Sequence, residues 1–348
     1  MIRVAALVVS LVLGGAIPLA AQASKPKILL YYDMEGISGI NREVQTGFAN
    51  PEYQEARKFL TGDVNAAIRG IAAGGAGTIV VTDAHGSGNP DPDILLDQMD
   101  KRATFEWRST PFDNYRDTPD KSFAAIVCIG MHARANTPGF LAHTWTIHPA
   151  FRVNGLDISE TEIIAHSAAR FGVPVIMVSG DDVLQKQVAE RLPHAEYGLV
   201  KRAKGIMDAD LLTQAQAQAN IESAAHRAMA KLGSIKPFQV APEYRFEMGW
   251  QNEAQADLAM LYPGLMRVNP TTVGYTRKGF IDGYDVAVAL IRITGAEQAR
   301  LLQQILSERP EGKAVMAEFE KRVLARWADP AAFKVAARPK PTRYHGAN

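Results

Sequence analysis

The sequence has only one cysteine in 348 residues, so it cannot form an intramolecular disulfide or a cysteine-rich zinc site. Cys128 lies inside the apolar run Ala124–Gly130. A buried thiol behaves as a small hydrophobic side chain, whereas a nucleophilic cysteine needs a polar, accessible setting. We therefore expect Cys128 to belong to the core, with a nucleophile as the weaker alternative.

An excess of charge of either sign is also missing. Lysine and arginine together number 38, against 37 for aspartate and glutamate, so no overall field attracts nucleic acid or an anionic membrane. The composition, 47% hydrophobic and 22% charged, is that of an ordinary globular protein, and repeats and low-complexity linkers are absent. The chain is long enough for one large domain or two smaller ones.

The first 23 residues resemble a secretory signal peptide. Arg3 precedes the apolar segment Val4–Leu13, two glycines and a proline then interrupt the pattern, and Ala21–Ala23 has the small-x-small form of a cleavage site. The alternative is an uncleaved anchor helix, for which the apolar stretch is barely long enough. We expect a mature protein that starts at Ser24, is periplasmic or secreted, and has no stable membrane anchor.

Runs that are apolar throughout alternate with helical patterns. This arrangement predicts an α/β fold with a mostly parallel central sheet flanked by helices, and a smaller mixed α+β C-terminal part. The expected buried strands are Ile28–Tyr32, Thr78–Thr82, Ala124–Gly130 and Val173–Ser179. The expected helices include 51–74, 94–99, 159–171, 183–192, 208–232 and 280–293.

The expected organisation has four parts. Residues 1–23 form the signal peptide, and 24–200 form an α/β metal-binding domain. Residues 201–295 add an α+β part to the same catalytic unit, with half-exposed strands near 244–248 and 271–276. Residues 296–348 form a helical extension and a loose tail.

Two carboxylates follow the first apolar run. Asp33 and Glu35 are two positions apart, and in an extended chain such residues project to the same side. Two close carboxylates need a shared proton, a basic partner or a cation, unless they belong to a solvated loop.

Two histidines come directly after other buried strands. In parallel sheets, ligands collect at the carboxyl ends of the strands, where Asp33, Glu35, His85 and His132 would all lie. Each histidine alone could be structural, but their convergence with carboxylates predicts a cation site. Imidazole and carboxylate are ligands that zinc accepts.

Glu160 is a further candidate ligand. Ser159 and Glu162 fit the capping box of a helix, so Glu162 is explained by local structure. Glu160 is free to point elsewhere, and its position in the first turn of the helix leaves ligation and a capping role equally open.

His143 lies eleven residues after His132 and is a candidate catalytic acid or base, or else it packs beside Trp145. Arg134 is a candidate for binding a substrate carboxylate, with a surface salt bridge as the alternative. Other polar residues at strand ends either accept hydrogen bonds from the ligand imidazoles or are turn residues, namely Asp83, Asp181 and Asp182. The remaining histidines are expected to be surface or structural: His148, His166, His194 and His226.

Several of these segments together resemble the M55 family of D-aminopeptidases. The resemblance runs in colinear order from Lys27 to Ile293. It rests on Asp33–Gly39, Asp83–His85, Gly130–Arg134, Thr137–Gly139, His143, Val173–Val175, Gly180–Asp182, Tyr262–Gly264 and Asn269–Val273. The sequence departs from the family pattern at Ser159 and Ile164, and the N-terminal segment and the tail are additions.

The resemblance implies a two-zinc aminopeptidase that removes an N-terminal D-amino acid from short peptides and assembles as a ring-shaped homo-oligomer. It assigns His143 as the catalytic histidine and Asp33 as the bridging ligand. The zinc ligands that it implies are Asp33, Glu35, His85, His132 and Glu160. For an exported enzyme, cell-wall peptides are the expected substrates. The alternatives are a metal-dependent amidase or esterase on another small acyl compound, and an exported metal-dependent peptide-binding protein without catalysis.

Overall fold

The computed structural model describes residues 25–106, 114–145 and 150–329. Its central element is a seven-stranded sheet in the order β3-β2-β1-β4-β7-β8-β9, in which only the β8–β9 pair is antiparallel. Its strands are β1 (Lys27–Tyr32), β2 (Thr78–Asp83), β3 (Ala103–Glu106), β4 (Ala125–Ile129), β7 (Val175–Asp181), β8 (Glu196–Gly205) and β9 (Asp208–Leu211). The predicted α/β class with a mostly parallel sheet is confirmed.

A second sheet has five antiparallel strands in the order β11-β12-β10-β5-β6. They are β5 (Ala150–Val153), β6 (Leu156–Asp157), β10 (Tyr244–Gly249), β11 (Met266–Asn269) and β12 (Thr272–Arg277). Asn154 and Gly155 join β5 to β6 with positive φ angles of 53° and 83°, the two-residue turn that an Asn-Gly pair predicts.

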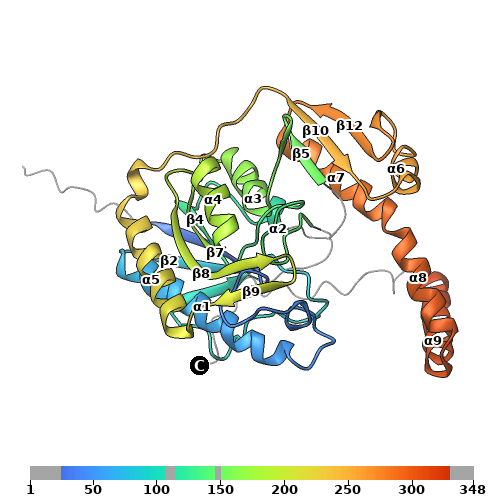
Figure 1. The fold of residues 1–348 in the computed structure, drawn as a ribbon, viewed down its shortest axis with the longest axis horizontal. Coiled ribbons are helices and arrows are strands. Elements are labelled where there is room, and N and C mark those ends of the chain that lie inside the picture. Colours follow the sequence, from blue (N-terminus) through green and yellow to red (C-terminus); the bar gives the residue numbers. More distant parts are fainter. Residues whose placement is uncertain (1–24, 107–113, 146–149, 330–348) are drawn as a thin grey trace, which may run out of the picture.

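Helices cover both faces of the seven-stranded sheet (Figure 1). The helices of the described residues are α1 (Tyr53–Ala73), α2 (Asn114–Asp117), α3 (Glu160–Ala169), α4 (Asp182–Arg191), α5 (Gln214–Ala230), α6 (Glu253–Ala259), α7 (Phe280–Thr294), α8 (Ala296–Ser307) and α9 (Pro310–Ala328), with 3-10 turns η1 (Glu43–Gln45) and η2 (Leu232–Ser234). Within the described residues, no helix is both long and apolar enough to cross a membrane.

The alternation of side chains along β1 divides the core into two clusters. Ile28, Leu30 and Tyr32 pack with residues of α1 and α5 on one face. Leu29 and Tyr31 pack on the other face with α3, α4, α7 and the second sheet. Because both faces are covered, every residue of β1 after Lys27 is buried, as expected for an interior parallel strand.

One predicted helix is wrong, and another begins later than predicted. Residues Asp208–Leu211 form β9, paired with β8, and the helix begins only at Gln214, after Thr213 caps it through a capping box. Residues 94–99 form turns, and the Arg57 side chain binds the carbonyl groups of Pro92 and Asp93 just before them. Within the described residues, the segment after Phe140 contains a single β-bridge residue, Thr144.

The C-terminal helices α8 and α9 project away from both sheets (Figure 1). They bear large apolar side chains that are more than half exposed, at Leu301, Leu302, Phe319, Leu324 and Trp327. The predicted signal peptide and the tail from residue 330 lie outside the described residues.

Candidate metal centre

Three neighbouring parallel strands place the candidate residues at one edge of the sheet. β1 lies between β2 and β4. The carboxyl end of β1 leads into Asp33 and Glu35, that of β2 into His85, and that of β4 into His132. Parallel strands end on the same side, so residues that are about 100 positions apart in the chain meet there.

The first group consists of Asp33, Glu35 and His85, each at most 7% exposed. His85 Nδ1 lies 3.0 Å from Asp33 Oδ1 and 3.1 Å from Glu35 Oε2. Its other ring nitrogen, Nε2, lies 3.0 Å from the carbonyl oxygen of Thr46. Three donor atoms from two strand ends therefore converge on one small space.

The second group consists of His132, His143 and Glu160. Glu160 Oε1 lies 3.6 Å from His132 Nε2 and 3.8 Å from His143 Nε2. His132 Nε2 also lies 3.4 Å from Asp33 Oδ2. Asp33 thus faces the first group with one oxygen and the second group with the other.

Backbone carbonyl groups determine which nitrogen of each of the three imidazoles carries the proton. Besides the bond of His85 to Thr46, His132 Nδ1 lies 3.0 Å from Ala133 O and His143 Nδ1 lies 2.7 Å from Leu141 O. A carbonyl oxygen only accepts, so the proton of each neutral ring is on the nitrogen that faces the carbonyl. The lone pair is then on the nitrogen that faces the carboxylates, as in a metal-binding histidine.

The site fits a zinc ion in its donor atoms and spacing. Donors held at 2.0–2.1 Å around a tetrahedral zinc are about 3.3 Å apart, and the distances within the site are 3.0–3.8 Å. Among the described residues, Glu35 Oε2 and His132 Nε2 are buried polar atoms without a hydrogen-bond partner. Buried polar atoms normally have partners, and a cation would supply one here.

The carboxylates and imidazoles perturb one another strongly. Burial and then the Glu35 carboxylate raise the pKa of Asp33 to about 8. Burial acts to raise the pKa of Glu160, but His132, His143 and the Tyr115 hydroxyl together lower it to about 2. Burial opposes protonation of His132, yet the carboxylates of Glu160, Asp33 and Glu35 together raise its pKa to about 10. Buried negative charge of this kind is stabilised by positive charge, which protons or a bound cation can provide.

Two glycines allow the ligand-bearing loops to touch. Gly36 N donates to Gly130 O at 2.8 Å, and a Cβ at Gly36 would lie only 1.9 Å from Met131 O. Gly130 has a positive φ of 71°, which glycine adopts without strain. The loop after β1 and the loop after β4 therefore pack backbone to backbone, which brings Asp33 close to His132.

The start of α3 shows that Glu160 does not cap the helix. Ser159 accepts from Glu162 N, and the Glu162 side chain accepts in turn from Ser159 N, which completes the capping box. Glu160 is left to point into the site, where Oε2 accepts from the Tyr115 hydroxyl at 2.5 Å and Oε1 accepts from Trp145 N at 2.6 Å. Tyr115 gave no signal in the sequence, because it lies in a segment without a motif.

A buried lysine lies behind the site and was also missed. Lys201, on β8, has no exposed surface, and its Nζ donates to Glu35 O at 2.8 Å and to Ile40 O at 2.9 Å. Burial lowers the pKa of Lys201 to about 7, although Asp181 and Asp63 act to raise it. Its only sequence signal was a charged residue next to the strand residues Leu199 and Val200.

The other polar side chains at strand ends accept hydrogen bonds from backbone N–H groups. Asp83 accepts from His85 N, Asp181 caps α4 and Asp182 accepts from Ala203 N, as turn and capping residues do. Arg134 forms no ion pair with any described residue.

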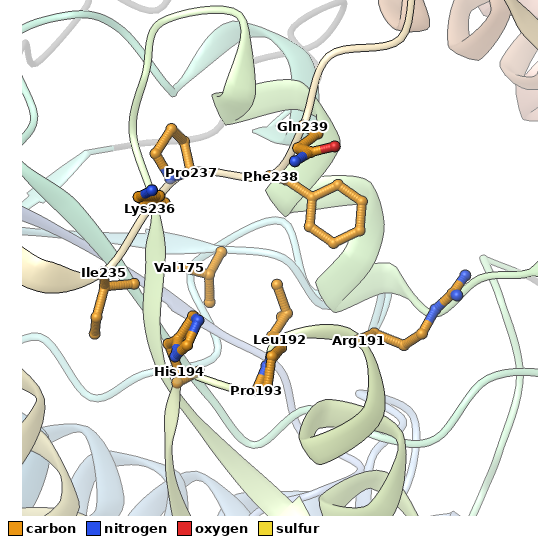
Figure 2. A pocket seen from close by; sticks show the side chains of 11 residues that line it. Val175, Arg191, Leu192, Pro193, His194, Ile235, Lys236, Pro237, Phe238 and Gln239 are labelled. Atoms are coloured by element: carbon orange, nitrogen blue, oxygen red, sulfur yellow. The ribbon is translucent and has the colours of Figure 1, made fainter.

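The remaining histidines that the structure describes do not join the site. His166 is buried between aromatic rings, with Phe238 at 4.4 Å and Phe280 at 4.5 Å between ring centroids. His226 is exposed on α5, and His148 lies outside the described residues. His194 lines a groove of about 390 Å³ together with Val175, Arg191 and Phe238 (Figure 2). Val175 begins β7, so this groove lies at the opposite edge of the sheet and contains none of the six converging residues.

Comparisons with known proteins agree with this geometry. The M55 peptidase family model, described as D-aminopeptidase, matches residues 27–289. The chain is 24% identical over 269 residues to the D-aminopeptidase of Bacillus subtilis strain 168, covering 77% of this chain and 97% of the relative. It is also similar to the solved structure of the Zn-dependent D-aminopeptidase DppA from Bacillus subtilis, described as a self-compartmentalizing protease. That match has a TM-score of 0.72 and 25% identity, and it covers 77% of this chain and 97% of the other.

Proposed function

The chain belongs to the M55 family of D-aminopeptidases, and from that premise we propose that it hydrolyses the N-terminal peptide bond of short peptides that begin with a D-amino acid. The observation that carries the proposal is the position of Asp33, whose two oxygens face two separate groups of nitrogen and oxygen donors. A carboxylate so placed suits a pair of cations, and the related Bacillus enzyme is described as Zn-dependent.

We assign Asp33, Glu35, His85, His132 and Glu160 as the ligands of two zinc ions, with Asp33 between them. Zinc at such a site acts as a Lewis acid toward a carbonyl group and lowers the pKa of water. The ligand side chains keep their orientation through the carbonyl groups of Thr46 and Ala133 and through the hydroxyl of Tyr115.

His143 is the residue that we assign to proton transfer. Its side chain is 20% exposed, whereas that of His132 is 1% exposed, so a substrate can approach His143. Its Nδ1 donates to Leu141 O, which leaves the Nε2 lone pair directed toward Glu160 and the space between the groups. A fixed imidazole with a free lone pair can accept a proton from water and return it to the leaving amine.

Arg134 is a candidate for binding the carboxylate of the peptide, since its guanidinium forms no ion pair with a described residue. A guanidinium binds a carboxylate through two parallel hydrogen bonds. A free C-terminus would then favour short peptides, because a longer chain carries its carboxylate further from the scissile bond.

The substrate assignment is tested by comparing D-Ala-D-Ala, L-Ala-L-Ala and simple esters on the purified zinc-loaded protein. We expect cleavage of the D-dipeptide to have the highest kcat/KM, and to be lost in His132→Ala. Equal or faster cleavage of the L-dipeptide would refute the D-specificity. Preferential cleavage of esters would support a metal-dependent esterase instead.

We also propose that the protein is exported and acts on peptides released from the cell wall, because its first 23 residues have the pattern of a signal peptide. N-terminal sequencing of the protein from its native host should find Ser24 as the first residue. An intact N-terminus in the cytosolic fraction would remove the basis for this proposal.

The description of the related enzyme as self-compartmentalizing suggests that this chain assembles as a homo-oligomer. Light scattering coupled to size-exclusion chromatography is expected to give a mass several times 37.9 kDa. A monomeric mass at the concentration of the activity assay would contradict it.

A further inference from the structure

Lys201 connects two loops that contribute to the metal centre. It has no exposed surface, and its Nζ donates to the carbonyl oxygens of Glu35 at 2.8 Å and Ile40 at 2.9 Å. These two carbonyl groups lie near the two ends of the loop that follows β1. A single amino group therefore joins the two ends of this loop.

The same loop is held at its middle by a second buried group. Ser38 N donates to Asp63 Oδ2 at 2.7 Å, and the Ser38 hydroxyl donates to Asp63 Oδ1 at 2.6 Å. Asp63 comes from α1 and Lys201 comes from β8, so elements on two sides fix the loop. The backbone of Glu35 is thereby immobilised at the residue whose carboxylate faces His85.

Lys201 also contacts the loop that carries His143. Its Nζ lies 4.5 Å from the centroid of the Phe140 ring. Phe140 N donates to Asp181 Oδ2 at 2.8 Å, and the next carbonyl, that of Leu141, accepts from His143 Nδ1. One buried side chain thus touches the backbone of a metal ligand and the segment that orients the proposed catalytic histidine.

We propose that Lys201 is a positioning residue, which holds the Glu35 loop in the arrangement that binds the cation and the Phe140–His143 loop in the arrangement that orients His143. It acts through Glu35 and Phe140 and does not contact the reacting atoms. The two hydrogen bonds need only N–H donors, so they form with the charged and the neutral amine alike. The inference rests on the proposed function for the identity of the cation, but the contacts themselves are independent of the substrate.

The test compares Lys201→Met with Lys204→Met, which makes the same substitution at an exposed position of the same strand. Methionine fills a similar volume and removes the donors. The Zn²⁺ affinity of metal-free protein is measured by competition with a chromophoric chelator, without substrate. We expect Lys201→Met to bind Zn²⁺ about 10- to 100-fold more weakly, the usual loss when a group supporting a ligand is removed, and Lys204→Met to match the wild type.

A role in folding alone gives a different result. The thermal midpoint would then fall, while the Zn²⁺ affinity of the folded protein stayed within about twofold of the wild type, and this result would overturn the inference. Lys201→Arg keeps N–H donors on a long side chain, so its affinity should lie between those of the wild type and Lys201→Met. Equal losses of Zn²⁺ affinity in Lys201→Met and Lys201→Arg would also contradict the inference, because the N–H donors would then make no difference.

Two further controls complete the design. Should Lys201→Met fail to fold, Lys201→Gln, which keeps an amide N–H at shorter reach, takes its place in the same comparison with Lys204→Met. With a D-dipeptide, kcat is expected to fall more than KM rises. A wild-type protein that binds Zn²⁺ but cleaves no D-peptide would refute the proposed function while leaving the binding result for Lys201 intact.

Discussion

The imidazole rings of His132 and His143 are stacked, with 4.0 Å between their centroids and 10° between their planes. Both turn Nε2 toward Glu160 Oε1, at 3.6 Å and 3.8 Å. They differ in access, because the His132 side chain is 1% exposed and that of His143 is 20% exposed. This pairing places an enclosed candidate ligand beside an accessible proton acceptor.

From this difference we predict that His143→Ala keeps zinc but loses activity. General acid–base groups typically contribute about 10²- to 10⁴-fold, and kcat should fall by that order. Elemental analysis of the variant should give the same zinc content as the wild type. His226→Ala, an exposed change on α5, serves as the control. Loss of one zinc in His143→Ala would identify His143 as a ligand instead.

Tyr115→Phe should weaken metal binding without removing any ligand. The change leaves Glu160 Oε2 without the hydroxyl that donates to it at 2.5 Å. A buried acceptor left unpaired costs about 1–3 kcal/mol, and loss of a supporting hydrogen bond typically lowers metal affinity about 10-fold or more. Competition with a chelator measures the zinc affinity. Tyr262→Phe, which makes the same substitution in the loop after α6, is the control. Unaltered zinc affinity would show that Tyr115 does not orient Glu160.

Gly36→Ala is expected to destabilise the fold. The added methyl group would lie 1.9 Å from Met131 O, so the two ligand-bearing loops would have to separate. Overpacking of this kind costs about 1–3 kcal/mol, which denaturant unfolding can measure. Gly233→Ala is the control, because nothing lies within 4 Å of its added Cβ. Similar stabilities for the two variants would contradict the close approach of the loops.

His166 should make the protein less stable in mild acid. Burial, together with Arg191, lowers its folded-state pKa to about 4 from an ordinary value of 6.5. Below pH 6.5 the unfolded chain binds the proton that the folded protein excludes, so stability falls between about pH 6.5 and pH 4. The full loss is about 3 kcal/mol at 1.36 kcal/mol per pKa unit.

Denaturant unfolding at pH 7 and pH 4.5 measures this effect. His166→Phe, which keeps a ring between Phe238 and Phe280, should lose less stability over this range than the wild type. His226→Phe, at an exposed position, should behave as the wild type does. An unchanged pH dependence in His166→Phe would mean that His166 is protonated in the folded state.

The fold class, and the edge of the sheet where polar residues gather, follow from the sequence alone. Strands such as Ile28–Tyr32 are apolar on both faces, which only a sheet covered on both sides can satisfy. Asp33, His85 and His132 follow such strands directly, so the rule that parallel strands end together was enough to predict their approach. Helix boundaries were less predictable, since β9 owes its existence to pairing with β8 rather than to local propensity.

The directions of individual side chains depend on contacts between distant parts of the chain. The capping box explained Glu162 from local sequence, but Glu160 turns toward His132 because Tyr115 and Trp145, distant in the chain, supply its hydrogen bonds. Lys201 likewise meets Glu35 across 166 positions. Local propensity acts over a few residues, whereas such contacts depend on strand order and register, which form only when the whole sheet assembles.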